Sequence, residues 1–314
     1  MLDFLLLVLG LTVLVVGGDV LVRGSVAIAE RLMIPPLIIG LTIVSLGTSA
    51  PEMFISVQAA LQGSGGLAIG NVVGSNIANV LLVLGLPALI HAQSCADKGI
   101  SRNILAMIGI TVVFMGMLAK GYMNWIDGAI LLVLLGLFLF DQYLTTKKQK
   151  PEDVHDYHED VPPLPSNVLV SIGLLAAGII LLPIGAWLTV DAARAIAGSL
   201  GVSDEIIGLT IVAVGTSLPE LAASLMAVLR GSSSVAIGNV VGSNVFNIAA
   251  IMGVTTLIAS VDVGAHLIYV DMWVMLGASL LLGWLAWHKK RISRRSGVIM
   301  MVAYVAFLGA AFLK

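Results

Sequence analysis

The chain has 314 residues, of which 59% are hydrophobic and only 11% are charged. Soluble domains carry about 25% charged residues, so this composition, with a mean hydropathy of +1.06, excludes an ordinary soluble protein and indicates an integral membrane protein. The net charge of −2 gives no sign of a nucleic-acid partner, and the single cysteine, Cys95, excludes an intramolecular disulfide.

Ten apolar segments are long enough to cross a lipid bilayer, because a spanning helix needs about 20 residues. The N-terminal sequence MLDFLLLVLG has no basic region before its apolar run, which indicates a retained transmembrane helix and not a cleaved signal peptide. We therefore expect an all-α polytopic membrane protein. The expected spans are 2–22, 36–61, 67–90, 103–119, 124–143, 167–190, 205–229, 235–259, 266–287 and 297–313.

One strongly polar stretch, 145–166, interrupts this series after the fifth span. Its prolines and mixed charges predict a solvated linker. The chain is thereby divided into two units of five helices, residues 1–144 and residues 167–314.

The distribution of Lys and Arg predicts the orientation in the membrane, since cytoplasmic loops carry an excess of these residues. With the N-terminus outside, 13 of the 16 Lys and Arg residues would face the cytoplasm. The opposite orientation would invert that ratio. We expect a multi-pass protein of the cell (inner) membrane with both termini outside and the linker in the cytoplasm.

The two halves contain a repeated block. Residues 40–85 align with 208–253 without a gap, at a constant offset of 168, and 26 of the 46 aligned positions are identical. The matches include Gly, Thr, Ser, Pro, Glu and Asn, which apolar bias does not produce, so the block indicates an internal duplication. Because five spans is an odd number, the second copy would enter the membrane from the opposite side, and inverted repeats of this kind are typical of transporters.

Each block contains a proline followed by an acid inside an apolar run: GTSAPE ends at Glu52 and GTSLPE ends at Glu220. A carboxylate in the membrane core costs about 2.5 kcal/mol or more, and proline removes a hydrogen bond from the helix. Backbone carbonyls freed at this depth need a partner, which a cation would supply. Inversion of the second copy would bring the two carboxylates face to face at the centre of the bilayer.

The second motif, GNVVGSN, adds hydroxyl and amide groups. Ser75 and Asn79 are four residues apart and share a helix face, as do Ser243 and Asn247. Together with the two carboxylates these are hard oxygen donors, which suit Ca²⁺ or Na⁺ and argue against zinc or copper. Two carboxylates balance the charge of one divalent ion.

The motifs G-T-S-x-P-E and G-N-x-x-G-S-N resemble the two α-repeats of the cation/calcium antiporter superfamily, close to the prokaryotic sodium/calcium exchangers. The resemblance covers essentially the whole chain. It implies a fold of ten helices in two inverted repeats. It also implies a secondary antiporter that carries Ca²⁺ and Na⁺ as substrates, without a cofactor or an obligate protein partner. In this family the first and sixth spans slide over the rest, which here would be 17–29 and 185–197.

The resemblance also implies the roles of individual residues. Glu52 and Glu220 would be the central ligands of calcium and sodium. Further ligand positions would be Thr48, Thr216, Ser75 and Ser243 (backbone carbonyls or hydroxyls), Ser49 and Ser217 (side chains), Ser45 and Ala213 (beside the outer sodium sites), and Asn79 and Asn247 (amides). Many sodium/calcium exchangers have one Asp at the last pair, whereas this chain has Asn at both, which leaves two formal charges.

Other functions remain as alternatives. A Ca²⁺/H⁺ or K⁺-dependent Na⁺/Ca²⁺ antiporter of the same superfamily would show much the same site. A cation channel would need a continuous polar path, which inverted broken helices do not favour. An intramembrane protease is not expected, because all five histidines lie at span ends or in loops, too far from Ser49 and Ser217 to act as a base.

Overall fold

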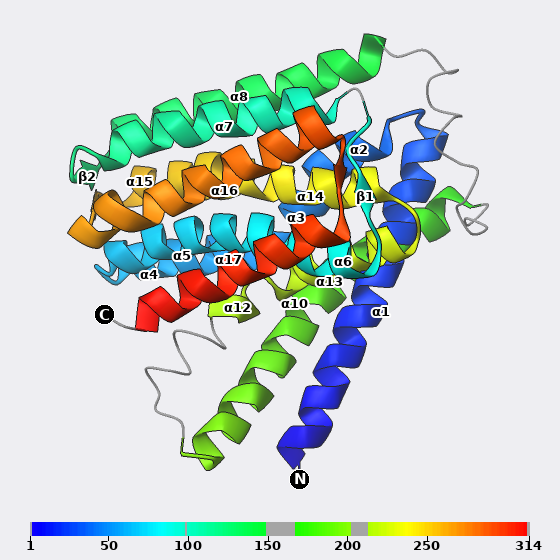
Figure 1. The fold of residues 1–314 in the computed structure, drawn as a ribbon, viewed down its shortest axis with the longest axis horizontal. Helices are drawn as coiled ribbons and strands as arrows, with labels where there is room; N and C mark the ends of the chain where they lie inside the picture. Colours follow the sequence, from blue (N-terminus) through cyan, green and yellow to red (C-terminus); the bar gives the residue numbers. More distant parts are fainter. Residues whose placement is uncertain (1, 98, 149–166, 202–212, 313–314) are drawn as a thin grey trace.

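The computed structural model describes residues 2–97, 99–148, 167–201 and 213–312, and nearly all of them are helical (Figure 1). The first half contains α1 (Leu2–Arg31), α2 (Pro36–Ile39), η1 (Gly40–Val44, a π-helical turn), α3 (Ser45–Thr48), α4 (Ala50–Leu61), α5 (Gly65–Ala78), η2 (Asn79–Leu84, π-helical), α6 (Gly85–Ile90), α7 (Ile100–Leu118) and α8 (Trp125–Lys148). The second half contains α10 (Val168–Ser199), α12 (Ala213–Gly215), α13 (Leu218–Leu229), α14 (Ser233–Val245), η4 (Phe246–Met252, π-helical), α15 (Gly253–Ile258), η5 (Leu267–Asp271), α16 (Met272–Trp284), η6 (Leu285–Lys289) and α17 (Arg294–Phe312).

Among the described residues, seven helices are long and apolar enough to cross a membrane. An eighth span is counted when Pro36–Thr48 and Ala50–Leu61, which are bent by 47°, are taken together. The expected seventh span, 205–229, is described only from residue 213 on, so the total of ten stays a prediction.

Three expected boundaries were wrong. The helix α1 continues to Arg31 and α10 continues to Ser199, because both extend past the apolar run into polar sequence. The first four residues of the expected linker, 145–148, belong to α8. The rest of that linker, 149–166, lies outside the described residues.

The two helices that contain the second motif form the centre of the molecule. In the continuous helix Ser233–Ile258, every residue of the most apolar part is buried. In the helix Gly65–Ile90, 78% of the most apolar part is buried. In Figure 1, α5 and α14 lie among α7, α16 and α17, which place their outer apolar side chains on the surface. The polar motif residues are therefore held in the interior of an apolar bundle.

The helices α1 and α10 pack along each other and extend away from this bundle (Figure 1). Their contact depends on glycines that let the two backbones approach closely. A methyl group on Gly24 would lie 2.5 Å from the backbone nitrogen of Leu175, and one on Gly178 would lie 2.5 Å from Cβ of Leu21. Alanine at either position would force the helices apart.

An ion pair connects α1 to the bundle. Asp19 of α1 is bound by Arg230, which follows α13, while Arg23 on the same helix lies 3.9 Å from the other oxygen of Asp19. Because Arg230 comes from the second half of the chain, this pair joins the α1–α10 unit to α13.

Two short antiparallel strand pairs join loops of the first half to loops of the second. One pairs β1 (Gln93–Ser94) with β4 (Arg291–Ile292), and the other pairs β2 (Tyr122–Met123) with β3 (Val261–Asp262). They lie at opposite ends of the bundle in Figure 1. The strand β3 follows β1 by 168 residues, the offset of the repeated blocks.

Candidate cation-binding site

The helix is interrupted at the same point in both copies of the first motif. The interruptions are at Ser49 (φ −85°, ψ 4°) and Ser217 (φ −90°, ψ 6°). Pro51 and Pro219 are then the second residues of α4 and α13, where a missing N–H leaves no hydrogen bond unmade. The proline therefore breaks the span and begins a new helix, as the motif predicts.

The two acids lie in the first turns of the new helices and meet in the interior. Glu52 is 1% exposed and Glu220 is 0% exposed. The Ser49 hydroxyl, from the break that precedes Glu52, donates a 3.1 Å hydrogen bond to Oε1 of Glu220. The motifs are thus brought together from opposite halves of the chain, and each acid lies at a helix N-terminus, where the helix dipole favours negative charge.

The asparagines of the second motif form a reciprocal network. Asn76 donates to the backbone oxygen of Asn244 (3.2 Å), and Asn244 donates to the backbone oxygen of Asn76 (3.4 Å). Asn79 donates to Oδ1 of Asn244 at 3.1 Å, and Asn247 donates to Oδ1 of Asn76 at 3.0 Å. The amide nitrogens of Asn79 and Asn247 are thereby used, which leaves their oxygens for another partner.

Hydroxyl groups connect the two motifs. The Thr48 hydroxyl lies 3.3 Å from Oδ1 of Asn239, to which it donates, and 3.5 Å from Oγ of Ser243. Ser45 donates to the backbone oxygen of Thr42 and lies against Gly242, where a methyl group would be 2.5 Å from its Oγ. The expected hydroxyls Thr48, Ser45 and Ser243 are therefore buried together.

The remaining expected residues are placed less fully. Ser75 and Ser217 are buried, and Thr216 is partly buried beside Ser217. Ala213 is the first residue of α12, and only its backbone is described.

Two pairs of polar residues were missed by sequence reasoning. Asn71 donates to Ser56 (3.0 Å) and to the backbone oxygen of Glu52 (3.4 Å). Asn239 donates in the same way to Ser224 (3.0 Å) and to the backbone oxygen of Glu220 (3.4 Å). The signal was present, because the four residues are identical pairs at the offset of 168. They hold the backbone that carries each acid.

The site contains buried oxygens that lack hydrogen-bond partners. Ten buried side-chain nitrogen or oxygen atoms are without a partner in the described part of the chain, and six of them belong to the motifs. These six are Glu52 Oε1 and Oε2, Glu220 Oε2, Ser217 Oγ, Asn79 Oδ1 and Asn247 Oδ1. Unpaired buried polar atoms are costly, so a concentration of them indicates a ligand.

The chemistry of these atoms restricts the ligand to a hard cation. All six are oxygens, and the described residues contain no group of three or more His, Cys, Asp or Glu that would suit a softer metal. Carboxylate, amide and hydroxyl oxygens are the donors that Ca²⁺ and Na⁺ take.

Comparison with known proteins agrees with this chemistry. A family model described as "Sodium/calcium exchanger protein" matches residues 2–144 and 170–313. CaxA of Alkalimonas amylolytica is 40% identical over 303 residues, 95% of each chain. The sodium/calcium exchanger MaX1 of Methanosarcina acetivorans is 32% identical over 357 aligned positions, which cover 99% of this chain and 98% of MaX1.

Solved structures match over the same extent. The sodium-calcium exchanger NCX_Mj, soaked with Na⁺ and Ca²⁺, superposes with a TM-score of 0.83 at 34% identity and covers 98% of both chains. The chain is an integral membrane protein that belongs to the sodium/calcium exchanger family of cation antiporters.

Proposed function

We propose that this protein exchanges Ca²⁺ for Na⁺ across the membrane, by alternating access at the site formed around Glu52 and Glu220. The observation that carries the proposal is a pair of fully buried carboxylates, three of whose four oxygens have no hydrogen-bond partner. A buried, uncompensated negative pair is strongly unfavourable in an apolar bundle. One Ca²⁺ would neutralise both charges.

Each expected ligand has a role in this proposal. Glu52 and Glu220 bind Ca²⁺ directly and also contribute to Na⁺ binding. The other ligands are the oxygens of Thr48, Thr216, Ser49, Ser217, Ser75, Ser243, Asn79 and Asn247, with Ser45 and Ala213 beside the outer Na⁺ positions. Because Asn79 and Asn247 are neutral, the site has two formal charges, so each additional Na⁺ beyond two would leave a net positive site.

Exchange follows from competition for the same oxygens. Ca²⁺ and Na⁺ cannot both bind the two carboxylates with full affinity. Entry of Na⁺ from one side therefore releases Ca²⁺ to the other side. If more sodium charge than calcium charge moves in a cycle, the membrane potential contributes about 2.3 kcal/mol per net charge per 100 mV. A negative interior would then favour calcium export.

We further propose ten spans in two inverted repeats, 1–144 and 167–314. Three features support this organisation: the reciprocal asparagine contacts, the matching Asn71–Ser56 and Asn239–Ser224 pairs, and the strand pairs at opposite ends. The α1–α10 unit, which the Asp19–Arg230 pair joins to the bundle, would be the part that slides. We propose an orientation with both termini outside.

The test is calcium-45 uptake into proteoliposomes loaded with sodium and diluted into sodium-free buffer. Uptake that requires internal sodium and disappears in Glu52→Gln supports the proposal. Uptake without any counter-ion gradient would contradict it and indicate a channel. Adding potassium to both sides in a parallel assay tests the potassium-dependent alternative.

A proton-coupled antiporter is the second candidate. The observation in its favour is that both oxygens of Glu52 lack a partner, so this carboxylate is free to take up a proton. Proteoliposomes loaded at low pH without sodium separate the two candidates. Calcium uptake driven equally well by protons would assign the chain to the proton-coupled branch.

A further inference from the structure

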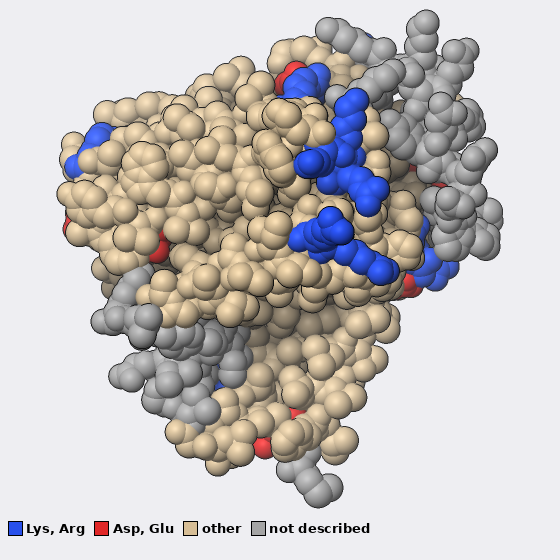
Figure 2. All heavy atoms as spheres, in the orientation of Figure 1, with Lys and Arg blue, Asp and Glu red and all other residues tan. Residues whose placement is uncertain are grey.

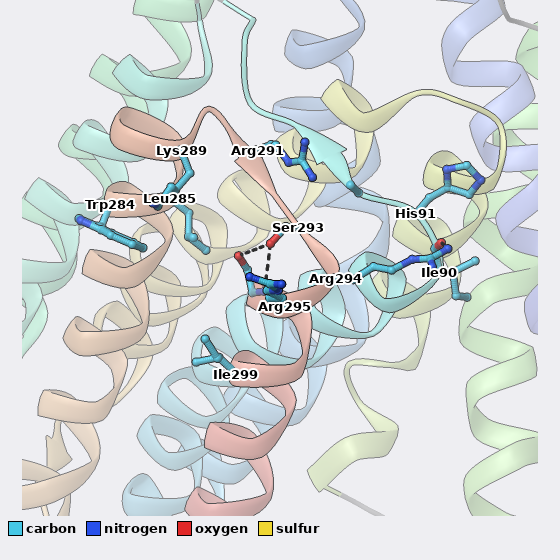
Figure 3. A pocket seen from close by; sticks show the side chains of 12 residues that line it. Ile90, His91, Trp284, Leu285, Lys289, Arg291, Ser293, Arg294, Arg295 and Ile299 are labelled. Carbon is cyan, nitrogen blue, oxygen red and sulfur yellow. Dashed lines mark hydrogen bonds between the residues drawn. The ribbon is translucent and has the colours of Figure 1, made fainter.

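A second candidate site, which shares no residue with the carboxylate site, lies at the end of the bundle where the β1–β4 pair is found. A pocket of about 800 Å³ opens between the end of α6, the loop that follows η6 and the first turns of α17 (Figure 3). Its lining includes the cationic side chains of Lys289, Arg291, Arg294 and Arg295. Figure 2 shows Lys and Arg gathered on this face in two neighbouring groups with no acid between them.

These four cations have no carboxylate partner among the residues that the structure describes. Lys289 lies over the ring of Trp284, with its Nζ 5.4 Å from the ring centre, and Arg294 donates to the backbone oxygen of Ile90 at 3.0 Å. Within the described part of the chain, the side chains of Arg291 and Arg295 have no contact of either kind. Like charges held around one hollow repel each other, so the pocket favours a negatively charged occupant.

The start of α17 adds to this repulsion. Arg294 and Arg295 occupy its first turn, which contains no acidic residue. Cations are unfavourable at a helix N-terminus, where the helix dipole is positive. A soluble loop would commonly place Asp or Glu here, and the chain instead places two arginines beside Arg291.

Besides the four cations, the lining contains the polar residues His91, Ser293 and Ser296 and the apolar residues Ile90, Ala92, Trp284, Leu285 and Ile299. Ile299 lies about one turn along α17 from Arg295 and is 60% exposed, and Trp284 is 46% exposed. In Figure 3, Ile299 lies below the cations, toward the membrane-spanning part of α17. The pocket thus combines four cations with exposed apolar side chains, Ile299 below Arg295 and Trp284 beside Leu285, which matches an amphiphile and not a free inorganic ion.

We propose that this pocket binds the phosphate-bearing headgroup of an anionic phospholipid, with an acyl chain lying along Ile299. Arginine is suited to phosphate because its planar guanidinium can donate two parallel hydrogen bonds. Basic pockets between membrane helices are sites where such headgroups bind. The proposal is independent of which ions the protein exchanges.

The bound headgroup would stabilise one particular helix contact. The helix α17 packs against α6 and η2, and a methyl group on Gly297 would lie 2.8 Å from the backbone oxygen of Gly85. Neutralising the cations at the start of α17 would strengthen this contact. Because η2 begins at Asn79, the lipid would brace the helix that carries one of the candidate site residues.

The test uses the purified full chain in an uncharged detergent and native mass spectrometry. Short-chain phosphatidylglycerol, phosphatidylcholine with the same chains, and sodium phosphate are titrated in separate arms. We expect phosphatidylglycerol to bind at concentrations at least tenfold below phosphatidylcholine, and phosphate not to displace it at equal concentration. Equal binding of both lipids, or displacement by equal phosphate, would overturn the proposal.

Variants locate the binding in this pocket. Arg291→Gln and Arg295→Gln should each weaken phosphatidylglycerol binding about fivefold, since a basic residue near the surface contributes roughly that factor. Lys147→Gln, which removes an exposed cation at the end of α8, is the matched control and should change nothing. Unchanged binding in both arginine variants, or an equal loss in the control, would overturn the assignment. The thermal melting temperature of each variant without lipid shows that it is folded.

Discussion

The two acids of the site end the same G-T-S-x-P-E motif, but their hydrogen-bond surroundings differ. Oε1 of Glu220 accepts a hydrogen bond from Ser49, whereas both oxygens of Glu52 lack a partner. The equivalent donor to Glu52 would be Ser217, and its hydroxyl has no partner either. The Glu220 half (Glu220 with Ser49) therefore contains an internal hydrogen bond, and the Glu52 half (Glu52 with Ser217) lacks one.

This difference cannot come from the motif letters, which are identical at the acid and at the serine. It also does not come from the backbone support, because Asn71 and Asn239 hold the two acids with the same pair of distances. The asymmetry lies in the relative placement of the two halves.

The largest effect is expected from removing either charge. Glu52→Gln and Glu220→Gln should each reduce calcium flux by at least about 100-fold, because affinity for Ca²⁺ depends steeply on the number of charged ligands. The two variants should differ in ion-free stability. Glu52→Gln should raise the melting temperature more, since it removes the charge that has no hydrogen-bond donor. The opposite order of melting temperatures would break the comparison.

A smaller effect is expected at the serines, and only on one side. Ser49→Ala should destabilise the ion-free protein by about 1.5–3 kcal/mol, because it removes a hydrogen bond to a buried carboxylate. Ser217→Ala removes a hydroxyl that has no partner, so it should be nearly neutral. Denaturation in calcium-free, sodium-free buffer measures both. Equal losses would show that the two halves are equivalent in solution.

The asparagine supports should behave alike. Asn71→Ala and Asn239→Ala each remove contacts to a serine and to the backbone of an acid, and Asn239→Ala also removes the acceptor of the Thr48 hydroxyl. Each loss should cost about 1.4 kcal/mol, so calcium flux should fall about tenfold in both variants. Leucine at the same positions serves as a second variant of similar size to asparagine. A loss confined to one asparagine would mean that the asymmetry extends to the backbone support.

The smallest effect is expected for maleimide labelling of Cys95. If this native thiol does not react, cysteines introduced into the two halves can be compared by labelling. Cys95 lies in the loop after α6, where burial raises the pKa of its thiol to about 12. The thiol is thus almost entirely protonated at pH 8, and it is buried, so it should react slowly. The unmodified protein should not react with a membrane-permeant maleimide at pH 8, as mass spectrometry would show.

Because Cys95 should not react, the labelling of Ser49→Cys and of Ser217→Cys would report the accessibility of each half separately. Because the Ser217 hydroxyl has no hydrogen-bond partner whereas the Ser49 hydroxyl donates to Glu220, we expect a cysteine at position 217 to be modified faster than one at position 49. Rapid labelling of the unmodified protein would remove the basis of the assay.

Much of this arrangement could be predicted from the sequence. The apolar runs predicted the helices, and the prolines predicted the breaks beside Glu52 and Glu220, because both depend on local chemistry. The asparagine supports could also have been found, since Asn71 with Ser56 recurs as Asn239 with Ser224. The extension of α1 to Arg31 could not, because polar residues past a span form helix or loop according to what packs on them. The hydrogen bond from Ser49 to Glu220 could not be predicted from the sequence either, because it depends on how the two halves are placed relative to each other.

Direct calcium binding tests the central claim that two acids from opposite halves form one site. Equilibrium dialysis of the purified protein with calcium-45 in sodium-free buffer should show one Ca²⁺ per chain. The bound calcium should be displaced by sodium and lost in both Glu52→Gln and Glu220→Gln. Calcium that remains bound with unchanged affinity in either variant, or that sodium does not displace, would contradict the account.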